Sequence, residues 1–189
     1  MVSRSSNHHI APTSSIHKDI EFCGNGSVII EDFCDVGNRV IFDTGGGEDG
    51  LIRLSSRAKI KSGCILRAYG NQIHIGHRVS IGECSLIAAH GGVEIDDNTM
   101  VAPFAILNAA GHIIKDKTPY RFQGETTSGI CIGKNVWIGA RSTTLDGVAI
   151  GDNAIIGAHS LVTRSIPENF LAFGSPATIQ NAIKQGDEE

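Results

Sequence analysis

Aliphatic residues recur every six positions along the second half of this chain. Between residues 132 and 167, successive groups of six open with Ile132, Ile138, Thr144, Ile150, Ile156 and Val162. This period fits neither an α-helix nor an ordinary strand, whose side chains repeat every ~3.6 and ~2 residues. It is typical of a chain that turns a corner every six residues and points one large side chain inward from each flat face. The pattern therefore predicts a triangular parallel β-helix.

The same phase returns upstream in four sets of three positions, each set forming one coil: Ile30, Val36 and Phe42; Leu54, Ile60 and Leu66; Ile75, Ile81 and Ile87; Ile95, Val101 and Leu107. Extra residues lie between the sets, so we expect the insertions at one corner of the triangle. The longest insertion separates Leu107 from Ile132. We expect about six coils within residues 27–167, and an excursion loop at 109–131 where function is first sought.

Both ends of the chain lie outside this repeat. Residues 1–26 are polar, and we expect them to form an arm or a cap over the end of the column. After Pro167 the groups of six stop, and residues 168–189 should turn at Gly174, Ser175 and Pro176 and end in a short helix near 179–184. We predict a single all-β domain.

Composition narrows the class of protein. A hydrophobic content of 41% with 5% aromatic residues and 23 glycines suits a narrow core of Ile, Val and Leu. The net charge of −4 gives no general attraction to nucleic acid or to an anionic membrane. Because the sequence has neither a long apolar run nor a signal peptide, we expect a cytoplasmic protein without membrane insertion.

The cysteines and histidines show no metal-binding spacing. Five cysteines are present and none forms a CxxC pair; Cys34 and Cys64 occupy small-residue positions and should be buried, unreactive thiols. We expect no metal.

Two stretches carry a resemblance to a known family. The segment IGKNVWIGARSTTLDGVAIGDNAIIGAHSLVTRSIPENFLAFGSPATI resembles the C-terminal half of the hexapeptide-repeat acyltransferases, most closely the galactoside, maltose and capsular-sugar O-acetyltransferases. The upstream VAPFAILNAAGH is similar to the segment that ends in their catalytic histidine. The resemblance implies a left-handed β-helix, a homotrimer with active sites between subunits, and acetyl-CoA as donor.

The resemblance also implies roles for individual residues. It places the catalytic histidine at His112. It implies donor contacts at Trp137, main-chain contacts to the pantetheine arm at Ala140 and Ala158, and residues toward the nucleotide at Thr163 and Arg164. Moving an acetyl group from a thioester to a hydroxyl needs a base for the hydroxyl proton, and histidine suits that role near neutral pH.

The acceptor is expected to be a sugar hydroxyl in a surface polysaccharide or a nucleotide sugar. Asn108, His90 and Tyr120 are the candidate acceptor-binding residues, the last with Phe122 and Arg121 beside it in the loop. Glu125 is a further candidate for orienting His112.

Two other functions stay open. The fold also serves zinc carbonic anhydrases with three histidine ligands at the trimer boundary. In this chain His74, His77, His90 and His112 lack the spacing of those ligands, and the NVWIG tract favours coenzyme A. The second alternative is a structural trimer without catalysis.

Overall fold

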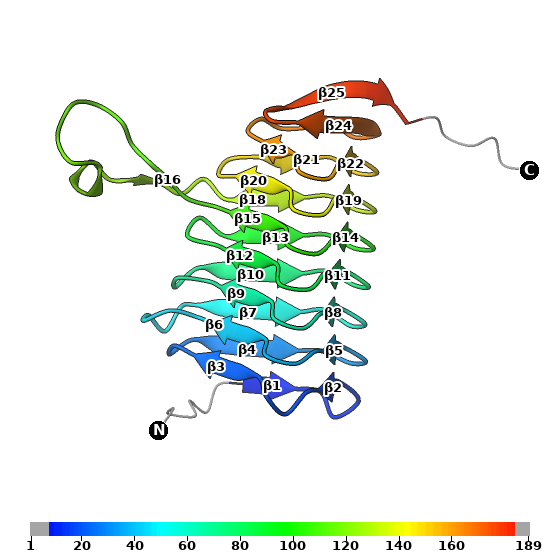
Figure 1. Ribbon diagram of the computed structural model, residues 1–189. Coiled ribbons are helices and arrows are strands. Elements are labelled where there is room, and N and C mark those ends of the chain that lie inside the picture. Colours follow the sequence, from blue (N-terminus) through cyan, green and yellow to red (C-terminus); the bar gives the residue numbers. More distant parts are fainter. Residues whose placement is uncertain (1–7, 184–189) are drawn as a thin grey trace, which may run out of the picture.

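The computed structural model describes residues 8–183, which form a column of seven stacked triangular coils (Figure 1). Three parallel sheets make its faces. Sheet A contains β1 (His8–Ile10), β4 (Ser27–Ile30), β7 (Leu51–Leu54), β10 (Gln72–Ile75), β13 (Val93–Ile95), β18 (Ile130–Ile132) and β21 (Ala149–Ile150).

The other two faces follow the same order. Sheet B contains β2 (Ser15–Ile16), β5 (Asp35–Val36), β8 (Lys59–Ile60), β11 (Ser80–Ile81), β14 (Met100–Val101), β19 (Trp137–Ile138), β22 (Ile155–Ile156), β24 (Phe170–Gly174) and β25 (Ala177–Ala182). Sheet C contains β3 (Glu21–Cys23), β6 (Ile41–Asp43), β9 (Ile65–Arg67), β12 (Leu86–Ala88), β15 (Ile106–Asn108), β20 (Thr143–Leu145) and β23 (Leu161–Val162).

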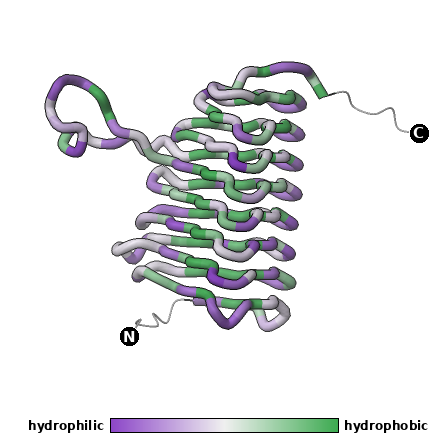
Figure 2. The backbone as a smooth tube through the Cα atoms, viewed as in Figure 1, coloured by the Kyte–Doolittle hydropathy of each residue, from purple (hydrophilic) through white to green (hydrophobic). Residues whose placement is uncertain are grey.

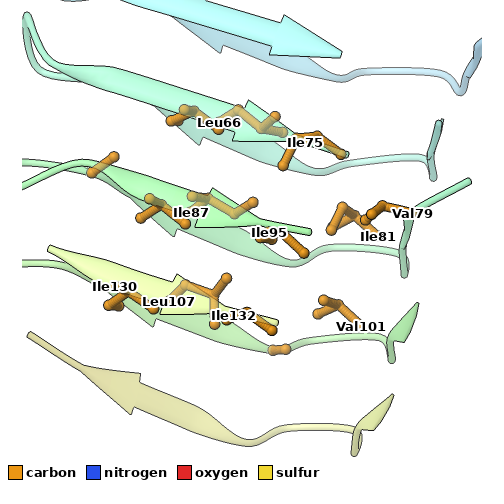
Figure 3. Close-up of a cluster of buried hydrophobic side chains, with 14 of the residues drawn as sticks. Leu66, Ile75, Val79, Ile81, Ile87, Ile95, Val101, Leu107, Ile130 and Ile132 are labelled. Atoms are coloured by element: carbon orange, nitrogen blue, oxygen red, sulfur yellow. The ribbon is translucent and has the colours of Figure 1, made fainter. Parts of the chain in front are cut away.

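The residues that open the sequence repeat form the core. Each lies over its counterpart in the next coil: in sheet A, Leu54 pairs with Ile75, which pairs with Ile95. Their side chains point inward and are almost wholly buried (Figure 3). Because strand side chains alternate, the residues between them face solvent, which gives every coil the alternating hydropathy seen in Figure 2. The predicted parallel β-helix is confirmed as an architecture of three parallel sheets.

Two expectations about the ends are wrong. The six coils expected within residues 27–167 are present, but residues 8–23 form a seventh coil before them in place of an arm or cap. The inward positions of this coil, Ile10, Ile16 and Phe22, keep the spacing of six. Residues 1–7 of the expected arm lie outside the described residues. The expected C-terminal helix is a strand over Ala177–Ala182, which pairs antiparallel with β24. Among residues 8–183 the single helical turn is the 3-10 turn η1 (Tyr120–Phe122).

All large insertions lie at the corner that joins sheet C to sheet A, which we call the CA corner. The excursion leaves this corner after β15 and returns at β18. In Figure 1 it projects sideways from the column. The corner between sheets B and C, the BC corner, carries no such insertion.

Candidate active site

His112 stands at the root of the excursion. The root is a two-stranded antiparallel ladder of β16 (Gly111–His112) and β17 (Glu125–Thr126), in which His112 pairs with Glu125 and Gly111 with Thr126. A Cβ at Gly111 would lie 2.9 Å from Thr126 Oγ1, so the glycine lets the two strands pair without displacing that hydroxyl. The imidazole of His112 is exposed and makes no hydrogen bond or ion pair to another described residue. It is therefore free to meet a ligand.

The rest of the excursion is organised by its own polar groups. The Gln123 side chain accepts a hydrogen bond from the Lys115 amide at 2.6 Å and donates to the Asp116 carbonyl at 3.2 Å. Three apolar side chains remain exposed on this loop, those of Ile114, Tyr120 and Phe122. No hydrogen bond, ion pair or ring stacking among the described residues joins Tyr120 to His112. Tyr120, expected to bind the acceptor, lies in η1, within the excursion.

The other two candidate acceptor residues lie at the CA corner with His112. Asn108 ends β15, and its amide nitrogen donates to the Ala110 carbonyl at 3.2 Å. His90 follows β12 one coil below, and its Nδ1 lies 3.6 Å from Glu125 Oε2. The carboxylate expected to orient His112 thus contacts His90 instead.

The point where the excursion rejoins the column is held by Asp146, which sequence reasoning missed. Its carboxylate accepts hydrogen bonds from the amides of Ser128, at 3.1 Å, and Gly129, at 2.9 Å. Partial burial of the carboxylate raises its pKa. The hydrogen bonds from these two amides, from the Gly147 amide and from the Thr126 hydroxyl outweigh this effect, so the pKa of the carboxyl is lowered. The Leu145-Asp146-Gly147 turn was its sole signal in the sequence.

We expect Asp146→Asn to destabilise the protein at neutral pH by about 1–2 kcal/mol, since an amide cannot accept all the hydrogen bonds that the half-exposed carboxylate accepts. A depressed carboxyl pKa stabilises above the unfolded pKa of about 4, and this contribution is lost as pH falls through the folded pKa. Denaturant unfolding should therefore separate wild type and variant at pH 7 and bring them together in acid.

The matched control is Asp116→Asn in the excursion. Hydrogen bonds from Thr118 also lower the pKa of Asp116, but this carboxyl is fully exposed. Its substitution should leave unfolding unchanged. An Asp146→Asn variant as stable as wild type at pH 7 would contradict the anchoring role.

The residues expected to bind the donor lie on two separate edges of the column. Trp137 stands on the outer face of sheet B, 49% exposed, between Met100 and Ile155 in adjacent coils. With Met100, Ile155 and three asparagines it lines a groove of about 370 Å³. Ala140 and Ala158 follow at the BC corner, and within residues 8–183 their backbone amides have no hydrogen-bond acceptor.

Thr163 and Arg164 are exposed and follow β23 at the CA corner, above the excursion. His112 shares this corner, whereas Trp137, Ala140 and Ala158 flank the opposite edge of sheet C. Within one chain, His112, Asn108 and His90 therefore lie at the same corner. Trp137, Ala140 and Ala158 lie away from them.

Two of the cysteines were expected to be buried, unreactive thiols, and the structure buries both. Cys34 and Cys64 are buried, and burial raises the pKa of Cys64 to about 11. A thiol of this kind stays protonated and is a poor nucleophile. Cys84 and Cys131 are exposed.

Within the described part of the chain, no three of the His, Cys, Asp and Glu residues are grouped so that they could hold a metal ion. His74, one of the histidines weighed for zinc, instead lies with Nε2 3.1 Å from Ser55 Oγ on the face of sheet A. Over the same residues, no helix has the length and apolar character needed to cross a membrane.

Known proteins share sequence and fold with this chain. Residues 132–164 match the model of the bacterial transferase hexapeptide family (six repeats). The chain is 39% identical over 121 residues to galactoside O-acetyltransferase of Escherichia coli (strain K12), a match covering 64% of this chain and 59% of the relative. This chain covers 38% to 60% of the length of the curated relatives that it matches.

Two solved structures are informative. The polySia-specific acetyltransferase NeuO superposes with a TM-score of 0.73 at 29% identity, covering 90% of this chain and 73% of that one. A galactoside acetyltransferase in complex with coenzyme A gives a TM-score of 0.56 at 39% identity, with 59% of this chain and 56% of that one covered.

Proposed function

We propose that this chain is a hexapeptide-repeat acetyltransferase and that it transfers the acetyl group of acetyl-CoA to a sugar hydroxyl; the family match and the relatives named above support this. The observation that carries the proposal is the position of His112 at the root of the excursion, where its imidazole is exposed and has no hydrogen-bond partner among residues 8–183. The left-handed coil implied by the sequence resemblance is part of the proposal. So is a cytoplasmic location, where acetyl-CoA is available.

In the proposed mechanism, neutral His112 removes the proton of the acceptor hydroxyl as its oxygen attacks the thioester carbonyl. The tetrahedral oxyanion collapses, the carbon–sulfur bond breaks, and the coenzyme A thiolate takes up the proton. No acyl-enzyme forms, and no cysteine or metal takes part. The free amides of Ala140 and Ala158 suit the main-chain hydrogen bonds that hold the pantetheine arm. Thr163 and Arg164 bind toward the nucleotide.

A homotrimer would join the two separated halves of this site. The outer face of sheet C carries a stripe of four apolar residues in register, namely Ile41, Ile65, Leu86 and Ile106. Thr143 and then Leu161 continue this row in the next two coils. If three columns turn sheet C toward a common axis, the CA corner of each meets the BC corner of its neighbour. His112 of one subunit then faces Trp137, Ala140 and Ala158 of the next.

The acceptor-binding residues in this proposal are Asn108 and His90 at the CA corner, and Tyr120 on the loop. The relatives named above act on a galactoside and on polysialic acid, which supports a sugar or glycan as the acceptor class.

The test is ligand binding followed by turnover. Acetyl-CoA should stabilise the fold by about 2.7 kcal/mol at a hundredfold excess over its dissociation constant, seen as a rise in melting temperature. Adenosine diphosphate ribose at the same concentration is the control, since it lacks the pantetheine arm. Acceptors are then screened by release of free coenzyme A.

An unchanged melting temperature at millimolar acetyl-CoA would contradict the proposal. Zinc found by elemental analysis, with turnover abolished by chelation, would point to the carbonic anhydrase class instead. Coenzyme A binding without transfer to any acceptor would point to a structural trimer.

A further inference from the structure

A continuous series of side-chain contacts runs along the CA corner, from the second coil to the root of the excursion. It starts at Asp43, whose Oδ2 accepts a hydrogen bond from Arg67 Nε at 2.9 Å. The Arg67 guanidinium lies 5.7 Å from the centre of the Tyr69 ring. That ring stacks on His90, with centroids 3.6 Å apart and planes at 28°.

This series of contacts ends at the excursion. His90 Nδ1 lies 3.6 Å from Glu125 Oε2, an ion pair when the imidazole is protonated. Glu125 is the residue that pairs with His112 across the β16–β17 ladder. The contacts therefore link the column directly to the strand opposite His112.

We propose that Tyr69, His90 and Glu125 form a brace that positions His112. In this role they act through the strand pair and not on the reacting atoms. The catalytic part of the inference rests on the proposed function; the structural part does not.

The first argument is that the root needs support. The ladder contains two residue pairs, and so short a two-stranded sheet is not stable alone. The His112 side chain has no described partner to fix it. Its position is therefore set by what holds β17. Asp146 interacts with the Thr126 hydroxyl at one residue of this strand, and His90 contacts the Glu125 side chain at the residue that pairs with His112.

The second argument is that the Tyr69 ring already has two partners. His90 stacks on one of its faces, and the Arg67 guanidinium lies close enough to be a cation–π partner. The face that stacks on His90 is therefore not open to a sugar ring. Phe122, 73% exposed on the loop, has no such stacked ring and remains better placed for a ligand.

The brace predicts a change in local opening of the root. In Tyr69→Ala, amide hydrogen exchange in β16 and β17, and at the Ile113 amide that donates to the Gly124 carbonyl at 3.1 Å, should speed up by up to about tenfold. This is the size expected for loss of an aromatic pair. Tyr69→Phe keeps the ring and should rescue the slow exchange. Strands β12 and β13 should be unaffected in both variants.

A matched control lies at another corner of the column. Phe33 also has a positive φ and an arginine over its ring, Arg57 at 5.6 Å, but it lies in the second coil far from the excursion. Phe33→Ala should leave exchange in β16 and β17 unchanged. If Tyr69→Ala does not fold, Glu125→Gln, which removes the charge at the other end, serves in its place.

Kinetics separate positioning from acceptor binding. A brace predicts that kcat falls by about tenfold in Tyr69→Ala with the KM for acetyl-CoA within about twofold, and that Tyr69→Phe recovers kcat. A rise in acceptor KM with unchanged kcat would show that Tyr69 and His90 contribute to acceptor binding alone, and would overturn the positioning role. So would unchanged exchange in both Tyr69→Ala and Glu125→Gln. If wild type transfers no acetyl group, the proposed function fails, and the exchange result still decides the brace.

Discussion

Replacing His112 with alanine should lower kcat by about 10² to 10⁴, the usual contribution of a positioned general base. The exposed imidazole makes no hydrogen bond or ion pair with another described residue, so its removal costs the fold no hydrogen bond. Coenzyme A affinity and subunit assembly should be unchanged, because the residues assigned to them lie elsewhere. Steady-state kinetics with the identified acceptor, and a coenzyme A binding isotherm, measure the two effects separately.

His9→Ala provides the control for this substitution. His9 is also exposed, and it lies on sheet A in the first coil. The His9→Ala variant should retain the turnover of wild type. If the His112→Ala variant turned over within about threefold of wild type, the general-base assignment would be wrong, and His90 would be the next candidate.

The second large effect is on assembly. Wild type should scatter light as a trimer of 20.0 kDa chains, and Leu86→Asp should behave as a monomer. Leu86 points outward from sheet C between Ile65 and Ile106. An aspartate there would place a carboxylate in an apolar interface without a partner, at about 3–5 kcal/mol for each uncompensated charge. Turnover should be lost with assembly, since each proposed site needs two subunits.

Ser80→Asp is the matched control, because Ser80 lies in the same coil on the outer face of sheet B. This variant should remain trimeric, and circular dichroism should show native β-structure for both variants. A monomeric wild type at micromolar concentration, or a trimeric Leu86→Asp, would contradict the arrangement around sheet C.

The core register was predictable because the period of six fixes which residues face inward. Ile75, Ile95 and Ile132 lie over one another as their spacing requires. The first coil was missed although Ile10, Ile16 and Phe22 keep the same period, since polar residues surround them and one coil alone is a weak signal. The last strand, Ala177–Ala182, departs from the period and pairs antiparallel, so the repeat could not foretell it.

The site was predictable to a lesser degree. The position of His112 at the root of an excursion followed from the interrupted repeat. The stacking of Tyr69 on His90 did not, because these residues occupy corners whose lengths differ from coil to coil. Their juxtaposition depends on backbone conformation at those corners, where Tyr69 has a φ of 55°. Contacts along an irregular edge are therefore read from the structure alone.

The antiparallel pairing of β25 also bears on aggregation. A stack of parallel coils ends in unpaired amides and carbonyls, which invite another molecule to continue the stack as a fibre. Here the last coil is followed on sheet B by β24, and β25 then folds back along it. On this face a further coil cannot be added in register beyond a reversed strand. The hairpin of β24 and β25 thus limits fibre growth along sheet B at this end of the column.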